Sequence, residues 1–199
     1  MDGRQLSPWL RRLRGTAEIV WIAALCAAVS LLVIGFIPRS PVTLQLPTAM
    51  LSGLGRVGGI TAGVIVDPAG RIILKVTDPS LAQRMIYLAT TLPGVLLIAE
   101  IARRTAGLLR AAQDSDPFTA QTARELTFVA KLTAFGGLGV WAITSGADWA
   151  LSATVLHSGQ AVQPHQSPFV WLAVGLVFAA FGQLIARGVA MRAELDTLI

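Results

Sequence analysis

The sequence contains one cysteine, Cys26, and only two histidines, so few of its side chains are suited to disulfide bonds or metal ligation. A single cysteine excludes an intramolecular disulfide and a thiolate metal cluster. His157 and His165 lie in one polar stretch, but no nearby cysteine or glutamate completes a metal site. We therefore expect no metal ion and no other cofactor.

Charged side chains are also scarce. Only 14% of the residues are Asp, Glu, Lys or Arg, and 54% are hydrophobic, whereas soluble domains average about 25% charged residues. This composition indicates a protein of the lipid bilayer. The net charge is +5, but the basic residues flank apolar runs instead of forming one stripe. They favour a role in membrane topology, and no direct binding of nucleic acid is expected.

Motifs typical of catalysis are missing from the chain. There is no phosphate-binding Gly-x-x-x-x-Gly-Lys loop. Serine and histidine occur, but without a nucleophile elbow or a glycine turn that would form an oxyanion hole. The sequence therefore predicts that the protein is not an enzyme.

Four long apolar runs predict an all-α integral membrane protein. About 20 apolar residues are needed to cross the hydrocarbon core as a helix. We predict one domain over residues 1–199, a four-transmembrane-helix bundle with spans at approximately 19–37, 85–102, 126–148 and 169–186. The first run is too long for a signal peptide. The third run continues toward Val155, so one end of that helix should project from the bilayer.

Small residues predict where these helices pack, because they let two backbones approach closely inside a membrane. The first span has two pairs of alanines at a spacing of four, Ala23 with Ala27 and Ala24 with Ala28. Three glycines reduce the side-chain bulk on the surface of the third span: Gly136, Gly137 and Gly139. A stripe on the fourth span predicts its packing face: Gly175, Ala179, Gly182 and Ala186. Pro93 should kink the second span.

Residues 38–84 form the only long segment between spans. Two β-branched runs flank Asp67-Pro68-Ala69-Gly70, which predicts a small β-hairpin over residues 63–76. Residues 42–46 alternate in polarity and could add a third strand. An isolated hairpin is marginally stable in water, so we expect this segment to lean on the helix ends.

A helix-entry motif precedes the third span: Asp116, Pro117, Phe118 and Thr119. Pro117 disfavours helix at the residue before it. Thr119 can then cap the new helix, and Phe118 can pack against the first turn as a hydrophobic staple. A competing capping box starts one turn later, at Thr122 with Glu125.

Three polar residues lie shallowly inside different spans: Glu100, Lys131 and Gln183. Ionisable groups within a membrane are often functional, so the three could meet in one polar cluster. In the alternative, Glu100 pairs locally with Arg103 or Arg104, three and four residues away, and Lys131 extends to water.

Arginines set the expected orientation. They gather before the first span, between the second and third, and after the fourth, whereas the stretch from His157 to Ser167 has no lysine or arginine. The positive-inside rule then places both termini in the cytoplasm. The long loop 38–84 and the histidine-containing stretch should face outward. We expect a multi-pass protein of the bacterial cytoplasmic membrane.

Two stretches resemble a known family. Asp116-Pro117-Phe118-Thr119 followed by Ala123-Arg124-Glu125-Leu126 is similar to the entry of the third helix in domain of unknown function 2975, and Gly188 to Glu194 resembles that family's closing Gly-x-x-Leu-Arg-x-Glu pattern. Thr122 and Ala193 depart from the family's usual asparagine and acid. The resemblance implies four spans and a long first outer loop. Helix-turn-helix regulators found beside many members imply a regulatory or sensing role. It implies no catalytic residue.

Two classes of function follow from the sequence. The first is an accessory, sensing or regulatory protein that lies in the lipid bilayer and binds another membrane protein or a cytoplasmic regulator. The second is a small transporter or pore-forming subunit. Transporters usually show internal repeats and broken helices at mid-membrane, and no repeat relates the two halves of this chain. The first class is therefore favoured.

Overall fold

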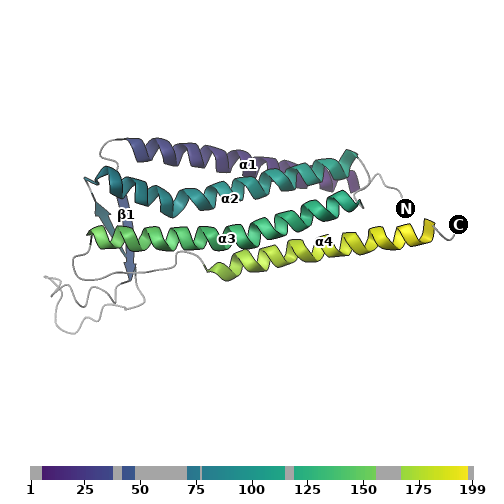
Figure 1. Ribbon diagram of the computed structural model, residues 1–199. Coiled ribbons are helices and arrows are strands. Elements are labelled where there is room, and N and C mark those ends of the chain that lie inside the picture. Colours follow the sequence, from purple (N-terminus) through teal and green to yellow (C-terminus); the bar gives the residue numbers. More distant parts are fainter. Residues whose placement is uncertain are drawn as a thin grey trace, which may run out of the picture. The chain divides into compact units, whose positions relative to one another are not determined.

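The computed structural model describes residues 6–37, 42–47, 71–76, 78–114, 119–155 and 167–196. Figure 1 shows the elements, which follow the chain as α1 (Leu6–Phe36), β1 (Val42–Pro47), β2 (Arg71–Val76), α2 (Leu81–Asp114), α3 (Ala120–Val155) and α4 (Pro168–Asp196). Each helix contains a stretch long and apolar enough to cross a membrane. The four predicted spans are therefore confirmed, and the chain is a multi-pass membrane protein.

Every helix is longer than the span predicted for it. The helices contain 31, 34, 36 and 29 residues, whereas about 20 suffice to cross the hydrocarbon. The difference arises because hydropathy detects only the apolar part of a helix. The flanking segments, such as residues 103–113, are rich in alanine, leucine and arginine, which are strong helix formers. The third helix continues to Val155, as predicted, and its projection from the bilayer stays a prediction.

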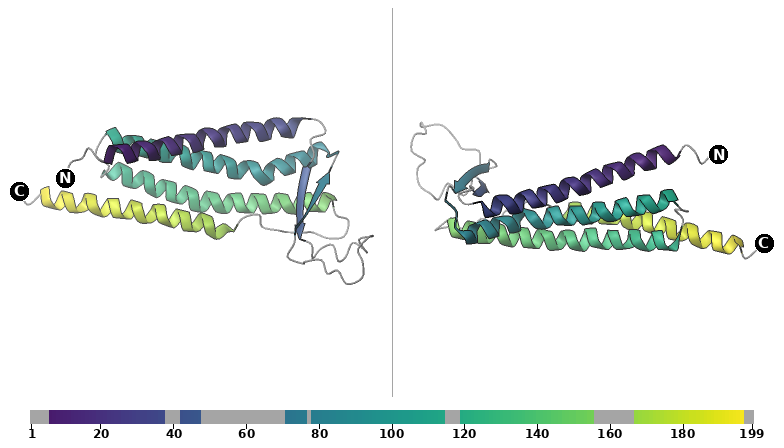
Figure 2. Two further views of the ribbon diagram at one scale, coloured as in Figure 1. Left: turned by 180° about the vertical axis from the view of Figure 1, so that it is seen from behind. Right: turned by 90° about the horizontal axis from the view of Figure 1, so that it is seen from above.

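The chain divides into two compact units, and the single domain predicted over residues 1–199 stays a prediction. Unit 1 comprises residues 1–30, 92–142 and 166–199, and unit 2 comprises residues 31–91 and 143–165. Within unit 1, successive helices run in opposite directions. The start of α1, the end of α2, the start of α3 and the end of α4 therefore lie at the same end of this unit (Figures 1 and 2).

Glycines bring α3 and α4 together in unit 1. A methyl group on Gly137 would overlap the Cβ and ring of Trp171. A Cβ at Gly175 would lie 3.1 Å from the carbonyl oxygen of Ala130, and one at Gly182 would lie 3.2 Å from Thr127 Oγ1. The predicted packing stripe on α4 is therefore confirmed, since two of its glycines lie against the α3 backbone.

The buried face of α3 follows a regular seam of mostly small residues. Its buried members are spaced by three, four or seven residues, as in a heptad pattern: Ala123, Ala130, Thr133, Gly137, Val140, Thr144, Ala147 and Leu151. On α1, Ala24 and Ala28 are buried whereas Ala23 and Ala27 are exposed.

Large apolar side chains face outward instead. Phe169 and Leu176 are 74% and 72% exposed, and Phe135 is 71% exposed. Small residues inside and large apolar residues outside form the arrangement expected of helices that pack in lipid, where contact between backbones replaces a hydrophobic core.

A two-stranded antiparallel sheet belongs to unit 2. β1 pairs with β2 in a register that matches Val42 with Val76 and Pro47 with Arg71. β2 is the second arm of the predicted hairpin, but its partner is the segment expected as an additional strand. The predicted first arm and the Asp67–Gly70 turn lie outside the described residues, so the tight hairpin is not supported.

The sheet leans on α2, as expected. Val42 is buried, and the hydroxyl groups of Thr43 and Tyr87 lie 3.5 Å apart. Beside them, α2 begins with a reciprocal capping box. The Gln83 amide N–H donates to Ser80 Oγ at 3.2 Å, and the Ser80 amide N–H donates to Gln83 Oε1 at 2.9 Å.

The α3–α4 contact can be tested at two glycines that lie two residues apart. Gly137→Ala should lower the free energy of unfolding by about 1–3 kcal/mol, because the added methyl overpacks against Trp171. Gly139→Ala is the matched control, since nothing lies within 4 Å of its added Cβ. The control should be neutral or should stabilise by up to about 1 kcal/mol through helix propensity. Thermal unfolding in detergent measures both variants, and an equal shift in their midpoints would contradict the packing.

Candidate functional site

The start of α3 is fixed by the cap that the sequence predicts. The amide N–H of Thr122 donates to Thr119 Oγ1 at 3.1 Å, and the carbonyl oxygen of Thr119 accepts from the amide of Ala123 at 3.2 Å. The cap at Thr119 is therefore confirmed, and the competing box at Thr122 is not used. The other motif residues, Asp116, Pro117 and Phe118, lie outside the described residues.

A glutamate ties α1 to α2 at this end of unit 1. Glu18 Oε1 accepts from Arg14 Nε at 2.8 Å on its own helix and from Arg110 Nη2 at 3.1 Å on α2. Arg14 also donates to the side-chain oxygen of Gln113 at 3.2 Å. Two arginines therefore share one carboxylate, and the group keeps a net positive charge.

A second group ties α2 to α3. Glu100 accepts two hydrogen bonds from Arg103 at 2.8 Å and one from Arg104 Nε at 2.7 Å. Arg104 Nη1 also lies 3.6 Å from Glu125 Oε2 on α3. Its guanidinium is stacked 4.2 Å above the centre of the Phe128 ring. Arg104 thus bridges two acids and an aromatic ring, a planar arrangement that lysine cannot reproduce.

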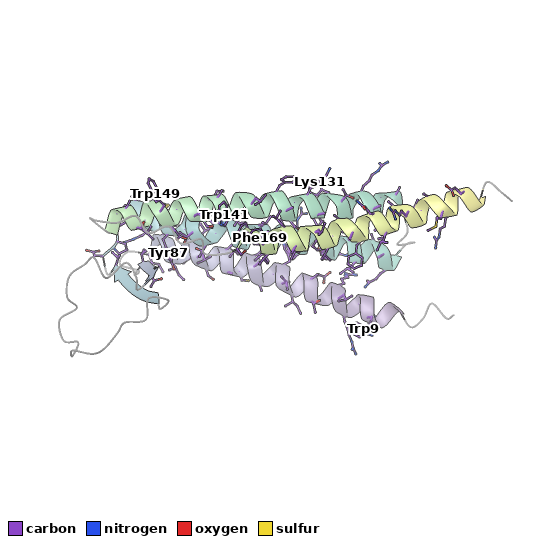
Figure 3. All side chains as sticks on the ribbon, turned by 90° about the horizontal axis from the view of Figure 1, so that it is seen from below. Trp9, Tyr87, Lys131, Trp141, Trp149 and Phe169 are labelled. Carbon is purple, nitrogen blue, oxygen red and sulfur yellow. The ribbon has the colours of Figure 1, made fainter. Side chains whose placement is uncertain are left out.

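The structure does not bring together the predicted cluster of Glu100, Lys131 and Gln183. Glu100 instead pairs with Arg103 and Arg104 on its own helix, which was the alternative prediction. Lys131 and Gln183 are exposed, and neither side chain forms a hydrogen bond or ion pair with a residue that the structure describes. Figure 3 shows Lys131 projecting outward from α3. The physical reason is spacing, because arginines one helical turn away reach Glu100 without any rearrangement between helices.

A cleft of about 420 Å³ opens between the end of α2 and the start of α3. The lining includes the Arg104–Glu125 ion pair and the Thr119 cap. The lining residues are Arg103, Arg104, Gly107, Leu108, Ala111, Thr119, Gln121, Thr122 and Glu125. Each guanidinium has five N–H donors, and Glu100 and Glu125 engage only some of them. The cleft can therefore accept an acidic group. Within the described ranges, no three His, Cys, Asp or Glu side chains are grouped to hold a metal ion.

Sequence reasoning missed the bridge from Arg104 to Glu125 and Phe128. The pairs within one helix are visible as spacings of three or four residues, such as Arg14 with Glu18. The Arg104–Glu125 pair joins two helices, and no local spacing reveals it. The short connection between Asp114 and Thr119 could have suggested that the end of α2 and the start of α3 lie side by side, but not which residues pair.

Comparison with known proteins finds one family. The model of the family described as Protein of unknown function (DUF2975) matches residues 73–199. The match begins at β2 and includes α2, α3 and α4, and with them the cleft and the Arg104 bridge. No curated protein and no solved structure matches the chain.

The stacking of Arg104 on Phe128 can be tested with a double-mutant cycle. Phe128→Leu keeps an apolar side chain but removes the ring, and should lower the free energy of unfolding by about 0.5–1 kcal/mol. In an Arg104→Gln background the same change should have a much smaller effect, because the cation is gone. Titration with SDS in mixed micelles measures both values.

Phe135→Leu, seven residues further along α3, is the control and should change stability by less than about 0.5 kcal/mol. An identical effect of Phe128→Leu in both backgrounds would show that the ring contributes only apolar contact.

Proposed function

We propose that this chain, which belongs to the family described as Protein of unknown function (DUF2975), is an accessory or regulatory protein of the bacterial cytoplasmic membrane. It binds an acidic segment of a partner protein, either another membrane protein or a cytoplasmic regulator, and catalyses no reaction. The observation that carries the proposal is the arginine-lined cleft at the charged end of unit 1.

Helix length supports a surface that stands outside the hydrocarbon. α2 has 34 residues, so at 1.5 Å per residue it is about 51 Å long. The hydrocarbon core is about 30 Å thick, which leaves roughly 20 Å of α2 beyond it. The arginines of the cleft lie in the last turns of this helix, where water and a soluble partner can reach them.

Ion pairs give this surface a defined shape. Glu18 joins α1 to α2, and Arg104 joins α2 to α3. Exposed pairs of this kind contribute little to stability, typically below about 1 kcal/mol each. They do orient the guanidinium groups before a partner arrives, which lowers the entropy that binding must overcome. A preorganised basic cleft of this kind favours an acidic peptide segment.

Two buried hydroxyl groups of α3 support an interaction protein over a transporter or pore. The Thr133 hydroxyl donates to the carbonyl oxygen of Val129 at 2.8 Å, and the Ser152 hydroxyl donates to that of Trp149 at 2.8 Å. Both are satisfied inside their own helix. A permeation pathway would instead need polar groups directed toward a passing solute.

Arginines support a cytoplasmic position for the charged end. The described basic residues of unit 1 cluster at the helix ends that meet there: Arg11, Arg12, Arg14, Arg103, Arg104, Arg110, Arg124, Lys131, Arg187 and Arg192. By the positive-inside rule, both termini then lie in the cytoplasm and the sheet-forming segment between α1 and α2 lies outside.

This topology predicts the result of reporter fusions. Fusions at Gly3, Gly70, Ser115 and Gly159 should read inside, outside, inside and outside in a bacterial host. Paired reporters, one active only in the cytoplasm and one only outside it, measure each position. An outside reading at Ser115 would contradict the proposed orientation.

The binding function can be tested by site-specific photo-crosslinking in cells. A photoreactive residue at Gln121, which is exposed in the cleft, should capture a defined protein partner. The matched control is Gln183, an exposed glutamine on α4 outside the cleft, which should not capture that partner. Arg103→Gln should reduce the Gln121 product roughly tenfold, because a hydrogen bond to a charged group contributes about 1.5–3 kcal/mol.

Two outcomes would overturn this proposal. In the first, Gln121 and Gln183 give the same products, so the cleft has no specificity. In the second, the purified protein conducts ions or a solute in sealed vesicles, and Gly137→Ala abolishes this flux while Gly139→Ala preserves it. That result would favour the transporter.

A further inference from the structure

A groove of about 510 Å³ runs between the start of α3 and the end of α4. Gly182 brings the two helices into close contact, since its added Cβ would lie 3.4 Å from the carbonyl oxygen of Ala123. One turn further along α4, Ala186 faces the groove, and its small side chain leaves space unfilled. Ala123, Thr127 and Val189 complete walls that are largely apolar.

Two cations line this apolar groove. Arg124 and Lys131 both lie on α3, seven residues apart, which places them about 10 Å from each other along the helix. Both are exposed, and neither side chain forms an ion pair or hydrogen bond with any residue in the described part of the chain. Arg104 and Arg110, at the same end of unit 1, each contact a glutamate. The charge of the groove is therefore not neutralised by the described residues.

We propose that this groove binds one anionic phospholipid of the surrounding membrane. The phosphate of the head group lies between Arg124 and Lys131, and an acyl chain lies along Thr127, Ala186 and Val189. Basic pockets between transmembrane helices are the recognised setting for anionic head groups. The site lies outside the arginine cleft and does not depend on the proposed protein partner.

The pairing of charge and apolar wall favours a lipid over a soluble anion. Inorganic phosphate would satisfy the two cations but would leave the alanine and valine walls in contact with water. An acyl chain packs against these walls, a contact that free phosphate cannot supply. Lysine near a membrane interface also extends its charged end toward the head groups while its methylene groups remain in the apolar layer. The position of Lys131, about two turns deeper than Arg124, fits this behaviour.

The test measures thermal stabilisation of the full-length protein in detergent. Dioleoylphosphatidylglycerol at roughly ten times its Kd should raise the unfolding midpoint by about 3–6 °C, and dioleoylphosphatidylcholine should not. Arg124→Gln combined with Lys131→Gln should abolish the rise. Arg11→Gln combined with Arg12→Gln removes the same charge from exposed positions on α1 and should preserve it.

A second variant addresses the apolar wall. Ala186→Leu fills the groove while both cations remain, so it should abolish the rise without lowering the midpoint in the absence of lipid. Three results would overturn the proposal. They are an equal loss in the Arg11/Arg12 control, an equal rise with phosphatidylcholine, and an equal rise with glycerol 3-phosphate, which carries no acyl chain.

Discussion

The fold of unit 1 depends on one constraint, the close approach of the α3 and α4 backbones. In lipid, apolar side chains gain nothing by leaving the solvent, so helices associate through contacts that large side chains would prevent. Gly137 meets Trp171 directly, and Gly175 lies against the carbonyl of Ala130. Once these contacts are fixed, the position of each later turn on α4 is fixed as well. The groove beyond Gly182 follows from the same geometry, because Ala186 and Ala123 continue the row of small residues where no bulky side chain enters.

The charges at the helix ends have a different role from the glycines. Glu18 accepts from Arg14 on its own helix and from Arg110 on α2, whereas Glu100 accepts from Arg103 and Arg104, which are both on its own helix. Local pairs form with little loss of side-chain entropy, and exposed ones contribute only tenths of a kcal/mol. Their main effect is to hold Arg104 and Arg110 in fixed positions. The arginines can then reach a neighbouring helix, and in the cleft they can reach a ligand.

Much of this arrangement was predictable from the sequence. Apolar length gave four spans, the Thr119 cap followed from capping chemistry, and the α4 stripe followed from the spacing of Gly175 and Gly182. The helices were predicted too short because hydropathy does not detect the polar turns at their ends. The hairpin was predicted from Asp67-Pro68-Ala69-Gly70, a strong local turn signal that lies outside the described residues, whereas the described partner of residues 71–76 is the distant segment 42–47. Local patterns carry no information about such distant contacts.

The same limit explains why the cluster of Glu100 and Lys131 was an attractive prediction that the structure does not support. Two side chains on neighbouring antiparallel helices can form a salt bridge only if they lie at the same depth in the membrane. They must also point toward each other around the two helix axes. Glu125 lies on the side of α3 that faces α2 and therefore meets Arg104. Lys131 is six residues further, and at 100° per residue this places it about 120° away from Glu125, on the side that carries Arg124 and faces the groove. Lys131 forms no ion pair with a described acid, so its charge is available to the anionic lipid that we propose for the groove.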